Sequence, residues 1–382
     1  MDGIGEGFLS CFPNSYGPFG PLAALDHLPT VGVPFIEMPI KNAGIPSFFK
    51  ETPLLTNASS LDDAKSVRER VVAAGMKLSS ANITSGNPLD ADGLQRTLDK
   101  LPLAAALGVP FVVAGAGELQ SSDDWPTLID HLRRIGDAAQ ELNIVYCCET
   151  HPGVCVSAAR MLETIERVDH PHIRLNFDTG NILYYNDGVN VVDELRAVLP
   201  FVEHVHLKDS NGVAGDWHFP ALGAGGAVNF TEVLKVLVDA AYNGPVSLEI
   251  EGIEGEPELS LSDYQERIAA SVRHLTVCAE AAGSESQRVR MDTGPATSTV
   301  RALVEEHYEF LYRFAYRLTG SAADAEDLTQ QTFLTACRKW QQIEDLGAAK
   351  GWLATTLRRL WTKSLARNGE TEFSRFEWIP DP

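Results

Sequence analysis

The sequence predicts an α/β fold, a (β/α)8 barrel, followed by a small all-α domain of three helices. Two observations lead to this prediction. Eight short β-rich runs alternate with longer helical patterns over about 280 residues, which is the order and roughly the size of such a barrel. Charge also divides the chain: residues 1–283 hold 18 Lys and Arg against 38 Asp and Glu, whereas residues 284–382 hold 13 against 14.

Composition excludes several classes of protein. Of the 382 residues, 44% are hydrophobic and 22% are charged, which is ordinary for a globular protein and excludes collagen-like, coiled-coil and wholly disordered chains. The longest apolar runs are far too short to span a bilayer. The net charge of −21 argues against non-specific DNA binding by the whole molecule.

Cysteine usage and the first residues predict the cellular compartment. The six cysteines form no CxxC motif, so a disulfide framework is not expected. The first ten residues include Asp2 and Glu6 but no Lys or Arg, and they lack the basic start of a signal peptide. We therefore expect a soluble, reduced protein of the cytoplasm.

A linker is expected between the two parts of the chain. Residues 284–299 read SESQRVRMDTGPATST, show no hydrophobic periodicity and include the pair Gly294-Pro295. A surface loop within one domain is the alternative, but the shift in charge at the same place favours a boundary. The predicted segments are a barrel over 1–283, a linker over 284–299, a helical domain over 300–368 and a tail over 369–382.

The elements expected in the barrel follow from local patterns. Strands are predicted at Gly7–Phe12, Pro34–Pro39, Lys77–Ile83, Pro110–Ala114, Ile144–Glu149, Ile173–Asp178, Val202–Leu207 and Val246–Ile250. Apolar residues spaced by three and four predict helices at Ala64–Ala74, Leu94–Leu107, Leu128–Leu142, Ala158–Val168 and Glu232–Ala241. A doubly wound open sheet is the main alternative. It would carry a Gly-rich phosphate turn after the first strand, and the sequence SCFP there is not one.

Polar residues end four consecutive strands of the predicted barrel. These residues are Glu149, Asp178, His206 and Glu249. A single Glu after a strand is ordinarily a helix cap or a surface charge, but four polar ends in successive units are harder to obtain by chance. Three carboxylates meeting at one barrel mouth would raise each other's pKa, and a divalent cation removes that problem. One imidazole and three carboxylates suit Mn²⁺, Mg²⁺, Co²⁺ or Zn²⁺.

Four stretches of the barrel carry a resemblance to a known family. They are ETHPG from Glu149, DTGN from Asp178, HVHLKD from His204 and SLE ending at Glu249. With them the sequence resembles the xylose-isomerase-like superfamily of sugar-phosphate isomerases and epimerases, which includes inosose dehydratases, hydroxypyruvate isomerases and ketose 3-epimerases. The resemblance implies that Glu149, Asp178, His206 and Glu249 bind one metal ion, with Mn²⁺ the first expectation. It also implies that the two glutamates move protons.

Further residues near these motifs are candidates for the site. Lys208 either polarises a substrate oxygen or acts as an acid, or it pairs with Asp209 or the neighbouring carboxylates. Glu251 points the same way as Glu249 along an extended strand and is the alternative fourth ligand. The loop Gly223–Gly226 either holds a phosphate with its backbone N–H groups or makes a tight turn. The catalytic assignments are Glu149, Glu249 and Lys208.

Substrate contact is assigned to four residues: His151, Asn181, His204 and His218. Two of them have open alternatives, because His151 could instead shape the Pro152-Gly153 turn and His204 could instead support His206 or pack. The predicted chemistry is proton abstraction beside a carbonyl, through an enediolate. Isomerisation, epimerisation and dehydration are all compatible with it, and the expected substrate is a sugar, a sugar phosphate or an inositol-derived hydroxy-ketone.

The last part of the sequence predicts three helices. Val300–Leu318 has one apolar face, Ser321 with Asp324 predicts a capping box for the next helix, and a third apolar pattern runs from Trp352 to Trp361. By pattern alone this is a small helical bundle with a basic face. The words LYRFAYRLTGSAADAEDLTQQTFLTACRKW and GWLATTLRR add that it resembles region 2 of extracytoplasmic-function sigma factors over about residues 300–368.

That second resemblance implies two contact surfaces. The acidic helix would contact RNA polymerase through Asp324, Glu326, Asp327 and Gln330. The third helix and the loop Gln341–Gly351 before it would engage the promoter −10 element through Trp352, Arg358, Arg359 and Lys363. Two interpretations of the whole chain follow: a barrel enzyme with an appended polymerase-binding module, or a transcription regulator whose barrel senses a sugar without turning it over. A vestigial C-terminal module is a third.

Overall fold

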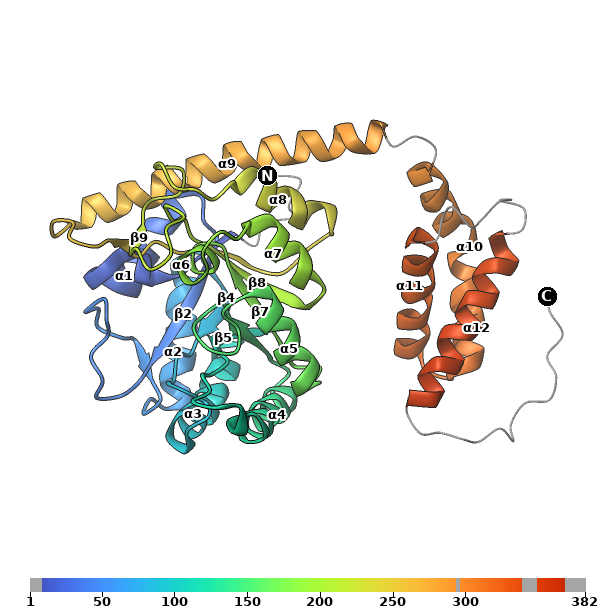
Figure 1. The fold of residues 1–382 in the computed structure, drawn as a ribbon, viewed down its shortest axis with the longest axis horizontal. Coiled ribbons are helices and arrows are strands. Elements are labelled where there is room, and N and C mark those ends of the chain that lie inside the picture. The colour runs from blue at the N-terminus through green and yellow to red at the C-terminus, as the bar shows by residue number, and fades with distance from the viewer. Residues whose placement is uncertain (1–8, 293–295, 339–348, 368–382) are drawn as a thin grey trace. The chain divides into compact units, whose positions relative to one another are not determined.

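The computed structural model describes residues 9–292, 296–338 and 349–367, with only part of the side chains after residue 283. The chain divides into two compact units, Met1–Ser286 and Gln287–Pro382. Each unit is described by itself. The first is a barrel and the second is a helical bundle, so the predicted fold class is confirmed (Figure 1).

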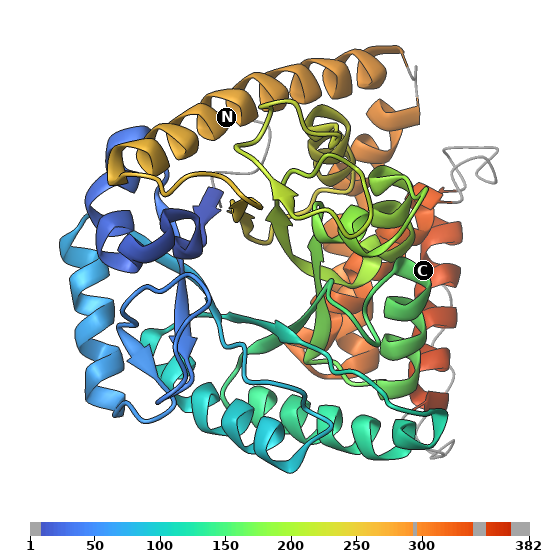
Figure 2. The ribbon, with the colours of Figure 1, turned by 60° about the vertical axis from the view of Figure 1, so that its left-hand side comes forward.

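Eight parallel strands close into the barrel, and all eight are predicted by the sequence. In the order in which they pair they are β1 (Leu9–Cys11), β2 (Phe35–Lys41), β4 (Lys77–Asn82), β5 (Phe111–Gly115), β6 (Val145–Glu149), β7 (Ile173–Asp178), β8 (Val202–Leu207) and β10 (Val246–Leu248). The ring closes because Cys11 of β1 is in register with both Ile36 of β2 and Leu248 of β10. Figure 2 shows this ring of strands inside its surrounding helices.

Helices cover the outside of the barrel. They are α1 (Gly20–His27), α2 (Leu61–Ala73), α3 (Ala91–Leu107), α4 (Trp125–Glu141), α5 (Ala158–Val168), α6 (Asn181–Tyr185), α7 (Val191–Val198), α8 (Phe230–Asp239) and α9 (Leu261–Asp292). Short 3₁₀ turns lie at Pro13–Phe19, Leu28–Val31, Ser122–Asp124 and Leu199–Phe201. In α4 the predicted face of Leu128, Leu132 and Ile135 is fully buried against the strands.

Three two-residue strands lie outside the ring. They are β3 (Leu55–Thr56), β9 (His218–Phe219) and β11 (Gly252–Ile253). β3 pairs in parallel with the last two residues of β2. β9, in the segment after β8, pairs antiparallel with β11, which follows β10. Strands of two residues carry no periodic signal in a sequence, so the sequence analysis did not predict them.

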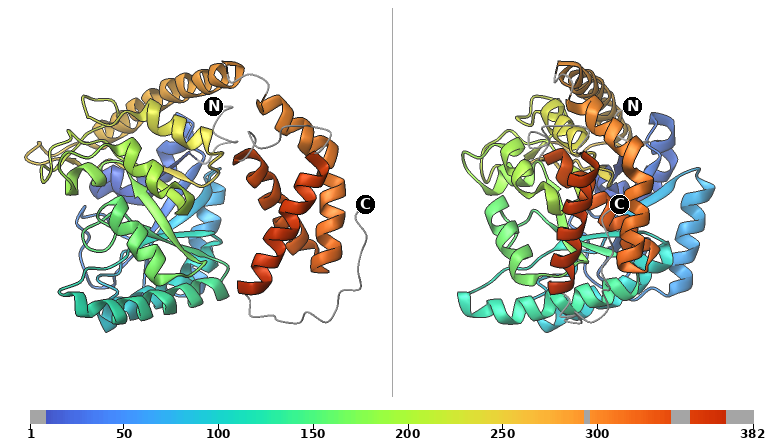
Figure 3. Two further views of the ribbon diagram at one scale, coloured as in Figure 1. Left: turned by 45° about the vertical axis from the view of Figure 1, so that its right-hand side comes forward. Right: turned by 90° about the vertical axis from the view of Figure 1, so that its right-hand side faces the viewer.

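The helical unit packs three helices around a core of its own. They are α10 (Ala296–Thr319), α11 (Ala322–Arg338) and α12 (Ala349–Arg367), lying side by side (Figure 3). Leu311, Leu353 and Leu357 are fully buried between them. The Ser321 hydroxyl accepts the backbone N–H of Asp324 at 3.4 Å, which is the N-cap contact that the sequence predicts. None of the helices in the described ranges is both long enough and apolar enough to cross a membrane.

The predicted irregular linker is largely helical. α9 continues to Asp292 and α10 begins at Ala296, which leaves only residues 293–295 of the expected linker 284–299 between them. The correction has a physical reason: residues 284–292 contain no Gly or Pro and are rich in helix-forming side chains, so the existing helix extends without a new nucleation cost. The predicted tail, 369–382, lies outside the described residues.

Candidate active site

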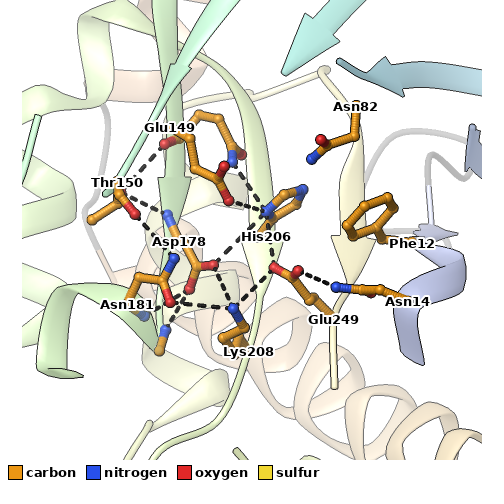
Figure 4. Close-up of polar contacts among 12 residues, drawn as sticks. Phe12, Asn14, Asn82, Glu149, Thr150, Asp178, Asn181, His206, Lys208 and Glu249 are labelled. Atoms are coloured by element: carbon orange, nitrogen blue, oxygen red, sulfur yellow. Dashed lines mark hydrogen bonds and ion pairs between the residues drawn. The ribbon is translucent and has the colours of Figure 1, made fainter. Parts of the chain in front are cut away.

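Four side chains converge at one rim of the barrel. Glu149 and Asp178 end β6 and β7, His206 lies on β8, and Glu249 follows β10. One ligand atom from each lies within 4.8 Å of the other three (Figure 4). His206 Nδ1 is 3.3 Å from Glu149 Oε1 and 3.1 Å from Glu249 Oε2. The structure therefore brings together the four residues that the sequence assigns to a metal, because the carboxyl ends of parallel strands share one rim.

The donor atoms of this cluster fit a divalent cation. Asp178 Oδ1 accepts the backbone N–H groups of Gly180 and Asn181 at 2.8 Å each, and Glu249 Oε1 accepts the amide of Asn14 at 2.6 Å. Among the described residues, the second oxygens, Asp178 Oδ2 and Glu249 Oε2, are buried and accept no hydrogen bond. These two buried oxygens, which also lie 3.5 and 3.3 Å from Lys208 Nζ, and the neighbouring imidazole nitrogen are donor atoms of the kind that can hold a divalent cation.

Glu37 of β2 supports this cluster, and the sequence analysis missed it. His206 Nε2 lies 3.0 Å from Glu37 Oε2 and donates its proton there, because a carboxylate can only accept. This contact leaves Nδ1 facing the other three cluster residues. Burial alone would lower the pKa of His206, but the carboxylates of Glu37 and Glu249 raise it well above its ordinary value. The signal was present, since Glu37 interrupts the apolar run FIEMPI in a buried strand.

The expected substrate contact of His204 is wrong. The side chain is fully buried, with Nε2 at 2.9 Å from the Ser80 hydroxyl and Nδ1 at 2.9 Å from Asn176 Oδ1. Burial lowers the pKa of His204 to about 3. His204 precedes His206 by two residues, so it points into the barrel one layer deeper and does not reach the mouth. It supports the site, as the alternative to substrate contact anticipated.

A cavity of about 330 Å³ lies above the cluster. Glu149 and Glu249 line it, whereas Asp178 and His206 lie beneath with no exposed side-chain surface. Two residues of the cluster thus contact the cavity, and the other two lie beneath these residues without contacting it. Of the remaining candidates, His151, Asn181 and Lys208 also line the cavity.

Lys208 is an ion-paired cation in the cavity wall. Its Nζ lies 2.9 Å from Glu251 Oε2, 3.3 Å from Glu249 Oε2 and 3.5 Å from Asp178 Oδ2. Burial alone would lower the pKa of Lys208, but Asp178, Glu249 and Glu251 together raise it well above its ordinary value. Glu251, the alternative fourth ligand, lies outside the four-residue cluster and is the nearest partner of Lys208 instead.

His218 does not line the cavity, contrary to expectation. It lies in the short strand β9, and the residues on either side of it in the chain, Trp217 and Phe219, do line the cavity. Successive side chains of an extended segment point to opposite sides, so a wall made by residues 217 and 219 turns residue 218 away. In the sequence DWHF the two aromatic residues, rather than the histidine, line the cavity.

The residues assigned to polymerase and DNA lie on two helices of the second unit. On α11, Asp324, Glu326 and Gln330 are exposed, as a contact surface requires. On α12, Arg359 is exposed, while the Arg358 guanidinium lies 5.9 Å from the Phe314 ring centroid. Trp352 is half-buried against the core of the unit, so its ring serves packing at least in part. The side chains of Asp327 and Lys363, and residues 341–348, lie outside the described residues.

Comparison with known protein families decides the identity of both units. Residues 26–283 match the family model of the xylose isomerase-like TIM barrel. The chain belongs to that family. Residues 303–371 match the family model of Sigma-70 region 2. Both resemblances stated from the sequence are confirmed.

Individual relatives cover parts of the chain. The ECF RNA polymerase sigma factor SigL of Mycobacterium tuberculosis is 42% identical over 77 residues, which are 19% of this chain and 42% of SigL. Inosose dehydratase 1 of Bacillus cereus is 30% identical over 148 residues, 34% of this chain and 48% of the dehydratase. The chain thus spans less than half the length of either. An L-ribulose 3-epimerase structure has a TM-score of 0.58 at 16% identity, with 74% of this chain and 97% of the epimerase covered, and it shows the shared fold.

The xylose isomerase-like barrel closes its glycine loop on an internal carboxylate. Asp209 Oδ2 accepts the N–H of Gly223 at 3.1 Å, and Asp209 Oδ1 accepts that of Val228 at 3.2 Å. A Cβ atom at Gly226 would lie 1.9 Å from Asp209 Oδ1, so only glycine allows the loop to approach the carboxylate this closely. The loop is therefore a turn that approaches Asp209 closely, and this carboxylate takes the N–H of Gly223, one of the groups that a bound phosphate would use.

Proposed function

We propose that the xylose isomerase-like barrel is a metal-dependent isomerase, epimerase or dehydratase that acts on a sugar or a related polyhydroxy ketone by enediolate proton transfer. The observation that carries the proposal is the division of the cluster: Glu149 and Glu249 line the cavity, while Asp178 and His206 lie beneath it. Two carboxylates that face one substrate can take a proton from one carbon and return it to the same or the next carbon.

The four cluster residues would hold the metal ion, with Mn²⁺ the first candidate. A divalent cation at this position would polarise the carbonyl and the neighbouring hydroxyl of a substrate, and so lower the cost of the charge that develops on oxygen. Glu37 would hold His206 in the orientation that this requires, through the contact at His206 Nε2. Asn14 holds Glu249 through Oε1, which leaves Oε2 on the side of the cluster.

The remaining polar groups of the cavity suit positioning and charge stabilisation. Lys208 is a buried cation that donates to Asn181 Oδ1 at 3.2 Å and lies 2.9 Å from Glu251 Oε2 and 3.3 Å from Glu249 Oε2, so it places a fixed positive charge in the cavity wall. Its raised pKa argues against proton abstraction by Lys208 and supports electrostatic stabilisation instead. His151 and Asn181 extend the polar wall on the β6 and β7 side of the cavity.

The test uses the full chain, freed of metal and reloaded with Mn²⁺, against a panel of ketoses and inososes. We expect turnover of at least one compound and incorporation of solvent deuterium beside its carbonyl. Glu149→Gln and Glu249→Gln should each lower kcat by about 10²–10⁴-fold, the usual contribution of general acid–base catalysis. Glu203→Gln, on the same strand as His206 but facing away from it, is the control. Full turnover in both active-site variants would refute the proton-transfer roles.

A second function is proposed for the Sigma-70 region 2 unit: binding to RNA polymerase and to promoter DNA. The 42% identity to SigL supports it, as do the exposed acidic side chains of α11. Under this proposal the barrel could also act as a sugar sensor without turnover. A pull-down of core RNA polymerase with the full chain tests the contact. Glu326→Lys should abolish capture, whereas Glu258→Lys on an exposed loop of the barrel should not; equal capture by both would refute the assignment.

A further inference from the structure

One wall of the cavity consists of aromatic rings from two separate loops. Phe48 and Phe49 belong to the loop after β2, and Trp217 and Phe219 belong to the segment after β8; all four line the cavity. The ring centroids of Phe48 and Trp217 are 5.4 Å apart, and those of Trp217 and Phe219 are 5.2 Å apart. The two loops therefore meet through their aromatic side chains above the carboxylate cluster.

This wall remains open to solvent where it forms the mouth of the cavity. Phe48 is 74% exposed and Ile45, in the same loop, is 57% exposed. An apolar patch at the rim of a polar cavity is a surface for a ligand that has an apolar face of its own. The C–H face of a closed polyol ring is such a surface, since the faces of aromatic rings carry partial negative charge and attract C–H groups.

A phosphorylated substrate would need an available cation to bind its phosphate group, and the described residues of the cavity do not supply one. The two lysines that line it are both paired: Lys41 Nζ lies 2.9 Å from Glu51 Oε1, and Lys208 is held by three carboxylates. The glycine loop after β8, residues 223–226, does not line this cavity, and the Asp209 carboxylate already accepts the N–H of Gly223.

The carboxyl groups at the cavity floor also oppose an anionic substrate. Glu149, Glu249 and Glu251 line the cavity, and Asp178 lies directly beneath it. Glu149, Glu249 and Asp178 exceed the single charge of Lys208 by two, which a bound divalent cation would balance, and Glu251 adds a further carboxyl group but no cation to the wall. A phosphate dianion that enters this site loses its hydration and gains repulsion in place of a partner.

We infer that the cavity accepts uncharged polyhydroxy ketones, whose C–H face stacks on Phe48 and Trp217, and that it rejects their phosphate esters. The inference rests on the proposed function and narrows its substrate class. It makes Phe48 and Trp217 specificity-determining residues, because they contact the C–H face of the substrate and not the carbons that exchange protons.

Binding of compounds that cannot react tests the inference independently of turnover. The full chain loaded with Mn²⁺ is titrated calorimetrically with myo-inositol and with myo-inositol 1-phosphate. We expect the uncharged polyol to bind at least about tenfold more tightly than its phosphate ester. Equal or tighter binding of the ester overturns the inference, and so does the absence of binding by either compound.

Turnover of matched ketones separates this inference from the proposed function. D-fructose and D-fructose 6-phosphate, D-psicose and D-psicose 6-phosphate, and an inosose form the panel. A higher kcat/KM for the uncharged member of each pair supports the inference, and preference for the ester overturns it while leaving the enzymatic proposal intact. If myo-inositol binds selectively but no ketone is turned over or exchanges deuterium, the enzymatic proposal fails and the binding inference stands.

Two variants assign the selectivity to residues. Trp217→Leu should raise KM for uncharged substrates by about tenfold, the energy of one aromatic contact, with little change in kcat. Val213→Ala, at an exposed position of the same loop, is the matched control. Glu51→Gln removes the carboxylate that pairs with Lys41, and binding of the phosphate ester should then improve relative to myo-inositol. An unchanged KM in the first variant, or an unchanged ratio in a folded second variant, contradicts the assignment.

Discussion

His206 is fixed from both sides of its ring, and this double contact determines what it can do. Nε2 donates to Glu37, while Nδ1 faces Glu149 and Glu249 at 3.3 and 3.1 Å. Neither the strand nor the rotamer alone would select between the two ring nitrogens. The carboxylate on β2 makes the selection, so one buried residue outside the cluster sets the geometry of the cluster.

Substitution of that residue should weaken metal binding without unfolding the barrel. Glu37→Gln retains the shape of the side chain and an acceptor for His206, but it removes the charge. We expect an affinity for Mn²⁺ about 10- to 100-fold lower, as measured by titration followed by electron paramagnetic resonance. Glu203→Gln is the control, and unchanged affinity in Glu37→Gln would show that His206 needs no carboxylate behind it.

Lys100 is a second buried charge that supports the cavity. It lies on α3 with no exposed surface, and its Nζ donates to Asn42 Oδ1 at 2.7 Å and to the Thr84 carbonyl at 2.8 Å. Asn42 and Thr84 both line the cavity. Burial, with smaller contributions from Arg96 and Lys41, lowers the pKa of Lys100 from 10.5 to about 7.

The lowered pKa predicts a pH-dependent stability. Between pH 7 and 10.5 the unfolded chain holds a proton on Lys100 that the folded chain has lost, so the free energy of unfolding rises with pH across this window. Compared with Lys100→Met, the wild-type protein should gain about 1.4 kcal/mol per pH unit within it. Urea unfolding from pH 6.5 to 9.5 measures the difference, and a constant difference would contradict the expectation.

At the scale of elements, the turn around Asp209 offers the sharpest test. In Gly226→Ala the new Cβ would meet the Asp209 carboxylate, so the loop after β8 must move away from its acceptor. We expect a loss of about 1–3 kcal/mol in the free energy of unfolding. Gly283→Ala in α9, where a Cβ would meet no atom within 4 Å, should be neutral or slightly stabilising in the same urea titration.

The elements with a repeating pattern were predictable, and the irregular ones were not. All eight barrel strands follow from apolar runs and turn residues, and the polar residues at or next to the ends of β6, β7 and β8 marked the rim of the site. β9 has two residues, so no alternation indicated that Trp217 and Phe219 would face the cavity while His218 turns away. Glu37 interrupts an apolar run, but its assignment to the site required knowledge of which side of β2 faces the barrel interior, because a buried strand shows no alternation.

At the scale of the whole molecule, two hydrophobic cores predict two unfolding events. The barrel and the helical unit each bury their own cluster of apolar side chains. A metal ion that binds only the folded barrel should raise the transition of that unit alone, by about 2.7 kcal/mol at a concentration 100 times the Kd. Calorimetry of the full chain with Mn²⁺ or with a chelator measures both transitions. A shift of both transitions by Mn²⁺ would contradict the assigned site. So would a comparison of variants in which Glu203→Gln loses the stabilisation by Mn²⁺ while Asp178→Asn retains it.

The barrel closes where β1 meets β10, and that junction lies beside Glu249. Asn14 donates to Glu249 across 235 residues of sequence, and the N–H of Ile250 donates to the Ser15 hydroxyl nearby. A growing polypeptide on the ribosome can therefore assemble Glu149, Asp178 and His206 early, yet it lacks the last carboxylate and its anchor until the final strand has docked. Under the proposed metal assignment, the ion would therefore bind late in biosynthesis, after the ring of strands has closed.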